Sequence, residues 1–154
     1  MILSRQADYG IRVMIDVARF GGSEPVTTRD IAERQQIPTA FLHKTVTQLS
    51  KAQLLSARRG AGGGLTLQRS ADLISVLHIV EAIEGPLSLM DCTMNGNPCE
   101  RSDHCAVHDL LEETTHELSA RLNATSLAEL LTKQIAADAK AKRRRKSIVQ
   151  INAR

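Results

Sequence analysis

The sequence predicts a mainly α-helical protein with a two-stranded β wing, that is, a winged helix-turn-helix followed by a long dimerisation helix. Three observations support this prediction. Two short helical patterns follow each other within residues 27–51, a glycine-rich hairpin pattern comes next, and a long amphipathic helical pattern lies near residues 108–122. A helix pair followed directly by a hairpin is the order of elements in a winged helix-turn-helix.

The first helix is predicted from about Ser4 to Phe20, because apolar side chains recur there at steps of three and four. The glycines and the proline within residues 21–25 end this helix. The apolar positions that define its buried face are Leu3, Ala7, Ile11, Met14, Ile15 and Ala18.

The next two helices form the predicted helix-turn-helix. Thr27 or Thr28 can cap the shorter one, and Pro38 followed by Thr39 favours the start of the other. The second helix of the pair buries Leu42, Val46 and Leu49 and exposes small and basic side chains. These exposed residues are Ala40, His43, Lys44, Thr47 and Lys51. Such a surface is typical of a recognition helix in the major groove, although many helix pairs share the pattern.

The wing is predicted from two short strands, Leu54–Arg58 and Leu65–Leu67, joined by the glycine-rich residues 60–64. Arg58 and Arg59 lie at this hairpin, and an arginine at a wing tip can enter the minor groove, where negative potential is concentrated. A phosphate-binding loop of a nucleotide enzyme is disfavoured. The turn lacks the Gly-Lys-Ser/Thr ending and does not lead into a helix.

Three more helical segments are predicted in the second half. An apolar helix spans residues 74–83, and a long amphipathic helix runs from His108 to about Leu122. The long helix could pack on its own domain, but pairing with a symmetry mate is favoured because palindromic operators match twofold proteins. Ser126 caps a last short helix through Leu131, and the basic run 140–146 predicts a disordered tail.

Charge is distributed unevenly along the chain. Residues 1–70 contain 10 Lys/Arg and 5 Asp/Glu, residues 71–139 contain 3 and 12, and residues 140–154 contain 7 and none. A basic first half is typical of a polyanion-binding module, although a patchy solvated surface would look the same. Aromatic residues are only 2% of the chain, which disfavours stacking on single strands and favours duplex DNA as the partner.

Some classes of protein are disfavoured. No apolar run is long enough to span a membrane, and residues 1–10 lack the basic start and apolar middle of a signal peptide, so a cytoplasmic location is expected. No Ser/His/Asp set, phosphate loop or paired-carboxylate pocket is apparent, so an enzyme is not expected. Three cysteines without a secretory signal argue against a disulfide framework.

The cysteines are the most informative chemical feature. Cys92, Cys99 and Cys105 fall within fourteen residues of loop composition, with His104 and His108 nearby. This set suits a soft metal or a cluster. Six and five residues separate the cysteines, whereas paired zinc ligands are usually two to four residues apart. The spacing therefore favours an iron–sulfur cluster, with a zinc site or a thiol redox switch as alternatives.

Several motifs together resemble one known family. The opening Met-Ile-Leu-Ser with Asp8-Tyr9-Gly10, the stretch 30–34 (Asp-Ile-Ala-Glu-Arg), the wing 59–65 and the three-cysteine loop after Glu84-Gly85 resemble the Rrf2 family of bacterial transcription regulators, of the IscR, NsrR and RirA type. The resemblance covers roughly residues 1–134. It implies a homodimer that acts as a DNA-binding repressor and senses nitric oxide, iron or cluster status, or redox stress.

The resemblance also assigns cluster ligands. It implies that Cys92, Cys99 and Cys105 hold a 2Fe–2S or 4Fe–4S cluster. The fourth ligand is either His108, as in IscR-type members, or Asp8 from the other subunit, as in NsrR-type members. Six residues separate the first two cysteines here, where IscR-type members usually have five, and this difference slightly favours Asp8.

The resemblance further implies which residues contact DNA. They are Ala40, His43 and Lys44 in the major groove and Arg59 in the minor groove; Thr39 and Arg58, which lie beside them in the sequence, are also predicted to contact DNA. His43 and Lys44 replace an acidic residue and an amide of the IscR type, so the preferred operator should differ. Lys44 can pair with guanine O6/N7 or contact only phosphate.

These predictions divide the chain into five regions. They are residues 1–70, the winged helix-turn-helix; 71–91, a connecting helix; 92–108, the cluster-binding loop; 109–136, the dimerisation and C-terminal helices; and 137–154, a basic, disordered tail.

Overall fold

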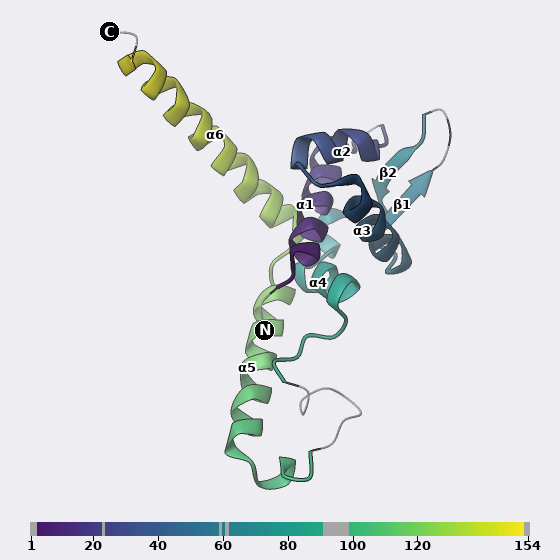
Figure 1. Ribbon diagram of the computed structural model, residues 1–154, viewed down its shortest axis with the longest axis vertical. Helices are drawn as coiled ribbons and strands as arrows, with labels where there is room; N and C mark the ends of the chain where they lie inside the picture. The colour runs from purple at the N-terminus through teal and green to yellow at the C-terminus, as the bar shows by residue number, and fades with distance from the viewer. Residues whose placement is uncertain (1–2, 23, 59, 61, 91–98, 153–154) are drawn as a thin grey trace.

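The computed structural model describes residues 3–22, 24–58, 60, 62–90 and 99–152. It is mainly helical with a two-stranded antiparallel wing, which confirms the predicted fold class (Figure 1). The elements in order are α1 (Arg5–Phe20), α2 (Thr28–Gln35), α3 (Thr39–Lys51), β1 (Leu55–Arg58), β2 (Gly64–Leu67), η1 (Ala71–Leu73), α4 (Val76–Glu84), η3 (Ser102–His104), α5 (Ala106–Asn123) and α6 (Leu127–Asn152).

Helix α1 lies at the centre of the winged domain, with α2, α3, α4 and the start of α6 packed around it (Figure 1). Its N-cap is Ser4, whose hydroxyl accepts hydrogen bonds from the backbone N–H groups of the first turn. Val13, Met14 and Val17 are buried on its inner side. Gly10 allows α1 and α4 to pack closely, because a Cβ there would lie 3.0 Å from the Ile83 side chain of α4.

The helix pair forms as predicted. Thr27 caps α2, since its hydroxyl accepts from the Asp30 N–H at 3.1 Å. Helix α3 begins at Thr39, and its predicted inner residues are buried: Leu42 and Leu49 are fully covered and Val46 is 9% exposed. The apolar spacing of this segment therefore predicted its packing correctly.

The wing is also confirmed. Strands β1 and β2 pair antiparallel, from Leu55 opposite Leu67 to Arg58 opposite Gly64. A β-bridge between Val26 and Leu65 ties the wing to the segment before α2. The close approach of this segment accounts for Gly64, because a Cβ at that position would lie 2.7 Å from the Val26 carbonyl oxygen.

A buried carboxylate joins α1 to α2. The Asp16 side chain is 0% exposed and accepts from Arg34 Nη2 at 2.7 Å and Nε at 3.1 Å. Gln35 Nε2 donates to the same carboxylate at 2.9 Å. The hydrogen bond that Arg34 donates to Asp16 raises the pKa of the arginine above its ordinary value, so the guanidinium stays charged.

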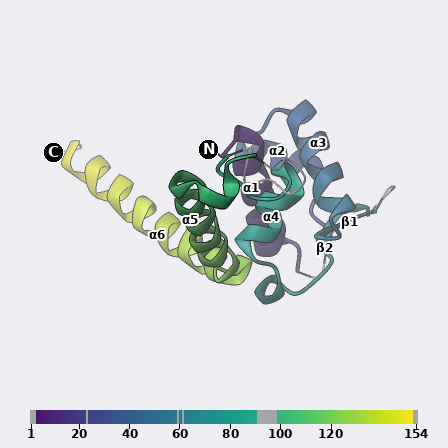
Figure 2. The ribbon, with the colours of Figure 1, turned by 90° about the horizontal axis from the view of Figure 1, so that it is seen from below.

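Helices α5 and α6 extend from the winged domain in different directions (Figures 1 and 2). The Ser126 hydroxyl accepts from the Glu129 N–H at 3.1 Å, which confirms the predicted cap. The last helix was predicted to end at Leu131 and to be followed by a disordered tail. In the structure, α6 instead continues to Asn152. The reason is composition: no Gly or Pro follows Pro98, and Ala, Leu, Gln, Lys and Arg favour helix. The basic run 140–146 had suggested disorder, although its residue types favour helix.

Helix α6 is fastened to α1 through Asp138. Arg19 Nη1 lies 2.5 Å from one Asp138 carboxylate oxygen, and Gln134 Nε2 donates to the other at 2.9 Å. These two hydrogen bonds lower the pKa of Asp138. Across the described residues, neither α6 nor any other helix has the length and apolar character needed to cross a membrane.

Candidate nucleic-acid interface and metal centre

The predicted DNA-contacting residues of α3 share its exposed side. Thr39, Ala40, His43 and Lys44, called here the recognition face, are all exposed in the N-terminal half of the helix. This is the half of a recognition helix that contacts base edges in the major groove. The helix lies beside the β1–β2 wing (Figure 1), so one surface presents both elements.

The wing arginines are described in part. Arg58 is exposed at the end of β1, where it pairs with Gly64 across the hairpin. Arg59 lies outside the described residues, so its predicted minor-groove contact stays a prediction.

Phe41 is a candidate contact that the sequence analysis did not identify. It is 52% exposed on α3, next to the recognition face, and its ring meets Tyr9 of α1 edge-on with centroids 6.1 Å apart. An exposed apolar side chain there can contact a thymine methyl group. The signal in the sequence was an aromatic residue that does not fit the buried spacing of Leu42, Val46 and Leu49.

Two of the three cysteines are described. Cys99 is exposed and Cys105 is half-buried, and they flank the short helix η3. Cys105 is the N-cap residue of α5. Cys92 lies outside the described residues, and within the described part of the chain no three His, Cys, Asp or Glu side chains are grouped as a metal site. The structure therefore describes Cys99 and Cys105 on either side of η3, and the grouping of Cys92 with them stays a prediction.

His108 has a ring nitrogen without a hydrogen-bond partner, one helical turn after Cys105. It lies in the first turn of α5, three residues after Cys105, and its side chain is only 16% exposed. Its Nδ1 atom is buried without a hydrogen-bond partner and lies 3.6 Å from Asp109 Oδ1, too far for a hydrogen bond. Buried polar atoms are normally paired. A ring nitrogen without a hydrogen-bond partner, three residues after a cysteine, is a candidate metal ligand.

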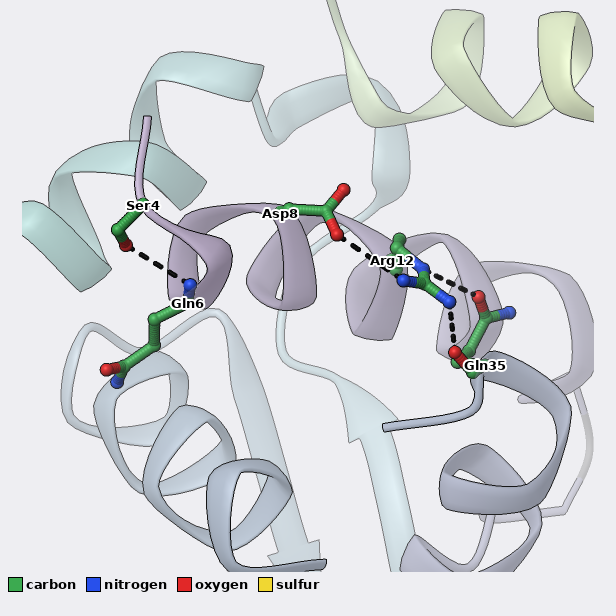
Figure 3. A network of polar contacts seen from close by, with 5 residues as sticks. All are labelled: Ser4, Gln6, Asp8, Arg12 and Gln35. Carbon is green, nitrogen blue, oxygen red and sulfur yellow. Dashed lines mark hydrogen bonds and ion pairs between the residues drawn. The ribbon is translucent and has the colours of Figure 1, made fainter. Parts of the chain in front are cut away.

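The other candidate ligand, Asp8, faces outward from α1. Its side chain is 59% exposed and pairs with Arg12 at 3.3 Å, as Figure 3 shows. Arg12 also donates to the side-chain oxygen of Gln35 at 3.3 Å and to its carbonyl, which orients the arginine. The exposure of the carboxylate leaves it accessible to a second subunit.

Polar contacts link the end of α4 to the N-terminus of α1 and to the recognition helix. Glu84, the last residue of α4, accepts hydrogen bonds from the N–H and the hydroxyl of Ser4, the N-cap residue of α1. Gln6 in the first turn of α1 donates to Gln48 of α3, and Gln48 donates to the Ile83 carbonyl at 3.1 Å. The end of α4, the N-terminus of α1 and helix α3 are thus connected, which spacing in the sequence did not reveal.

A recognition helix with exposed small and basic side chains, set beside a β wing, defines this protein as a winged helix-turn-helix transcriptional regulator. Residues 3–133 match the Rrf2 family, described as an iron-dependent transcriptional regulator. The chain belongs to the Rrf2 family of transcriptional regulators, and it is a regulator rather than an enzyme, as predicted.

Similar proteins agree with this assignment. The HTH-type transcriptional regulator IscR of Klebsiella pneumoniae is 33% identical over 134 residues, which are 87% of this chain and 82% of the relative. IscR of Sodalis glossinidius is 32% identical over 134 residues, 87% of this chain and 81% of the relative.

Solved structures show the same fold. CymR, the global cysteine regulator of B. subtilis, has a TM-score of 0.71 at 26% identity, covering 86% of this chain and 98% of its own. IscR of T. potens has a TM-score of 0.70 at 28% identity, covering 87% and 88%.

Proposed function

We propose that this protein is a cytoplasmic homodimeric repressor whose binding to duplex operator DNA is governed by an iron–sulfur cluster. The ligands are Cys92, Cys99 and Cys105 with one further residue. The observation that supports the cluster most directly is the unpaired, buried Nδ1 of His108, one helical turn after Cys105. The similar proteins include regulators named IscR, and the family is described as iron-dependent.

Helix α5 supports the homodimer. Its apolar residues Val107, Leu110, Leu111, Leu118 and Leu122 recur at helical spacing on one side. Val107 and Leu110 are 57% and 61% exposed, and no residue of α5, which is described in full, is buried. A second copy of α5 would cover this apolar stripe. The two recognition faces of such a dimer match the two half-sites of a palindromic operator.

The three cysteines and one further ligand suit an iron–sulfur cluster chemically. Thiolates are soft ligands, and an imidazole or a carboxylate can complete the set. When bound, an iron–sulfur cluster supplies a centre that responds to iron supply, oxidants and nitric oxide. The fourth ligand is His108 or Asp8 of the partner subunit. The described contacts favour His108, because its Nδ1 has no hydrogen-bond partner whereas Asp8 accepts a hydrogen bond from Arg12.

Hydrogen bonds connect the end of α4, which precedes the cysteine segment, to the recognition helix α3. Glu84 ends α4 eight residues before Cys92 and accepts hydrogen bonds from Ser4, the N-cap residue of α1. Gln48 joins α3 to both α1 and the end of α4. A change in how the cysteine segment is held therefore acts on the N-terminus of α1 and on the placement of the recognition helix.

DNA binding through the wing is tested by Arg59→Ala. We expect weaker binding to an operator duplex selected from a random-sequence pool, and a salt dependence whose slope falls by about one unit for each phosphate that the wing no longer neutralises. Titration at several salt concentrations measures both. Lys133→Ala on α6 removes an equal charge far along the chain from the wing and should leave the slope unchanged. An Arg59→Ala slope equal to that of the wild type would contradict the role of the wing.

The fourth ligand is tested by single substitutions of His108 and Asp8. We expect His108→Ala to alter the visible absorption of protein prepared without oxygen, because the cluster loses one ligand. His116→Ala, an exposed histidine of the same helix, is the matched control. A spectrum altered only by Asp8→Ala would assign the ligand to Asp8 of the partner subunit. A spectrum altered by neither would exclude both.

A further inference from the structure

The C-terminal part of α6 concentrates positive charge beyond the residues that match the family. Lys140, Lys142, Arg143 and Arg144 are all exposed on this helix, and residues 140–154 contain seven Lys/Arg and no Asp/Glu. The match to the family ends at residue 133. The basic segment is thus an addition to the winged domain rather than one of the family's shared elements.

The packing of α6 on the winged domain fixes where the basic segment lies. Its first half packs against α1 and η1, and Asp138 fastens it to Arg19 at 2.5 Å. Beyond Asp138 the same helix continues to Asn152. Figures 1 and 2 both show α6 leaving the winged domain on the side away from α3 and the wing. The basic segment therefore does not lie over the recognition face of its own subunit.

The chemistry of the segment indicates its partner. At 100° per residue, its four exposed basic side chains spread over more than half of the helix circumference. Lys140 and Arg144 are like charges at positions i and i+4, which destabilises an isolated helix. Phosphates on a polyanion would neutralise this charge. Between residues 136 and 147 the only apolar residues are alanines. The basic run 140–146 therefore lacks the apolar face by which a helix enters a membrane surface, and the apolar residues Ile148, Val149 and Ile151 come only after it.

We propose that the basic segment of α6 binds the phosphate backbone of a second DNA duplex, while α3 and the wing hold the operator. The opposite placement of the two basic surfaces on one subunit supports this arrangement, in which the protein bridges two duplexes. The inference rests on the proposed DNA binding of the recognition face. Binding at α6 is independent of sequence, because it contacts phosphates and no base edges.

The experiment uses the full chain on beads that carry the selected operator duplex. A fluorescent duplex of unrelated sequence is added, and both the captured protein and the retained fluorescence are measured. The test variant combines Lys140→Gln, Lys142→Gln, Arg143→Gln and Arg144→Gln, since glutamine keeps a similar helix propensity. The matched control keeps every charge by combining Lys140→Arg, Lys142→Arg, Arg143→Lys and Arg144→Lys.

We expect all three proteins to bind the operator, and the wild type and the control to retain the fluorescent duplex. The glutamine variant should retain at least about 10-fold less of the fluorescent duplex than the wild type. For four phosphate contacts, the wild type should lose affinity for the second duplex on the order of 100-fold between roughly 50 and 200 mM salt.

The possible failures are distinguishable. Equal operator capture with fluorescence unchanged in the glutamine variant would overturn the bridge and leave the proposed function standing. Failure of every protein to capture the operator would overturn both, since a bridge needs its first duplex. Binding of the three proteins to vesicles that contain anionic lipid is measured as well. Charge-dependent binding to these vesicles without retention of the second duplex would assign the segment to a membrane surface and overturn the bridge.

Discussion

Serine in place of Cys92, Cys99 or Cys105 is expected to remove iron and acid-labile sulfide from the protein purified without oxygen. A serine hydroxyl is a poor ligand for iron–sulfur centres, and the loss of one thiolate from a set of three leaves too few ligands. Operator affinity should change by about 10-fold or more, the range of a typical coupling free energy between two sites. Iron and sulfide counting and an operator titration measure the two effects.

A neighbouring substitution controls for damage to the segment. Glu100→Gln changes an exposed side chain between Cys99 and η3 and should keep both iron and operator affinity. Colourless wild-type protein that contains zinc, or that forms a disulfide on oxidation, would support the zinc site or the thiol switch in place of the cluster. Iron retained by all three serine variants would contradict the ligand assignment.

Arg34→Met is expected to destabilise the fold by about 3 kcal/mol, because it leaves the fully buried Asp16 carboxylate without its charged partner. This value is at the low end for a broken buried pair, since the Arg34 side chain is 35% exposed. Urea unfolding measures the loss. Arg29→Met is the matched control: it breaks an exposed pair with Glu33 and should cost less than about 0.5 kcal/mol.

A double variant separates the ion pair from packing. Asp16→Leu combined with Arg34→Met removes both charges and should recover much of the lost stability, because an apolar pair avoids the cost of a buried charge. Equal unfolding free energies for Arg34→Met and Arg29→Met would contradict the importance of the buried carboxylate.

Local patterns predicted most of the fold. The spacing of Leu42, Val46 and Leu49 identified the inner side of α3, and the glycine run between two short apolar segments identified the wing. Caps were predicted equally well, as the hydrogen bonds of Thr27 and Ser126 show. These features depend on neighbours within a few residues, so the sequence alone reveals them.

Contacts between distant residues could not be predicted in the same way. Asp16 and Arg34 are 18 residues apart, and Gln6 and Gln48 are 42 apart, so no periodic pattern connects them. The length of α6 was missed for a different reason. Its charge run suggested disorder, while its lack of Gly and Pro favours helix.

The candidate site was predicted in outline. Residue types and a family resemblance identified the cysteines, Asp8 and His108, and the structure adds the unpaired Nδ1 of His108 and the outward position of Asp8. Cys92 and Arg59 lie outside the described residues, so their roles stay predictions. Phe41 was missed because an exposed aromatic residue looks like a core residue when only its type is considered.

Control of DNA binding by an iron–sulfur cluster is tested most directly by comparing operator binding by the wild-type protein with and without its metal centre. Protein purified without oxygen is assayed for iron and acid-labile sulfide, and its affinity for the selected operator is measured before and after chelation. We expect both elements to be present and the operator affinity to change by about 10-fold or more on their removal. Protein lacking iron and sulfide, or an affinity that chelation does not change, would contradict control by a cluster.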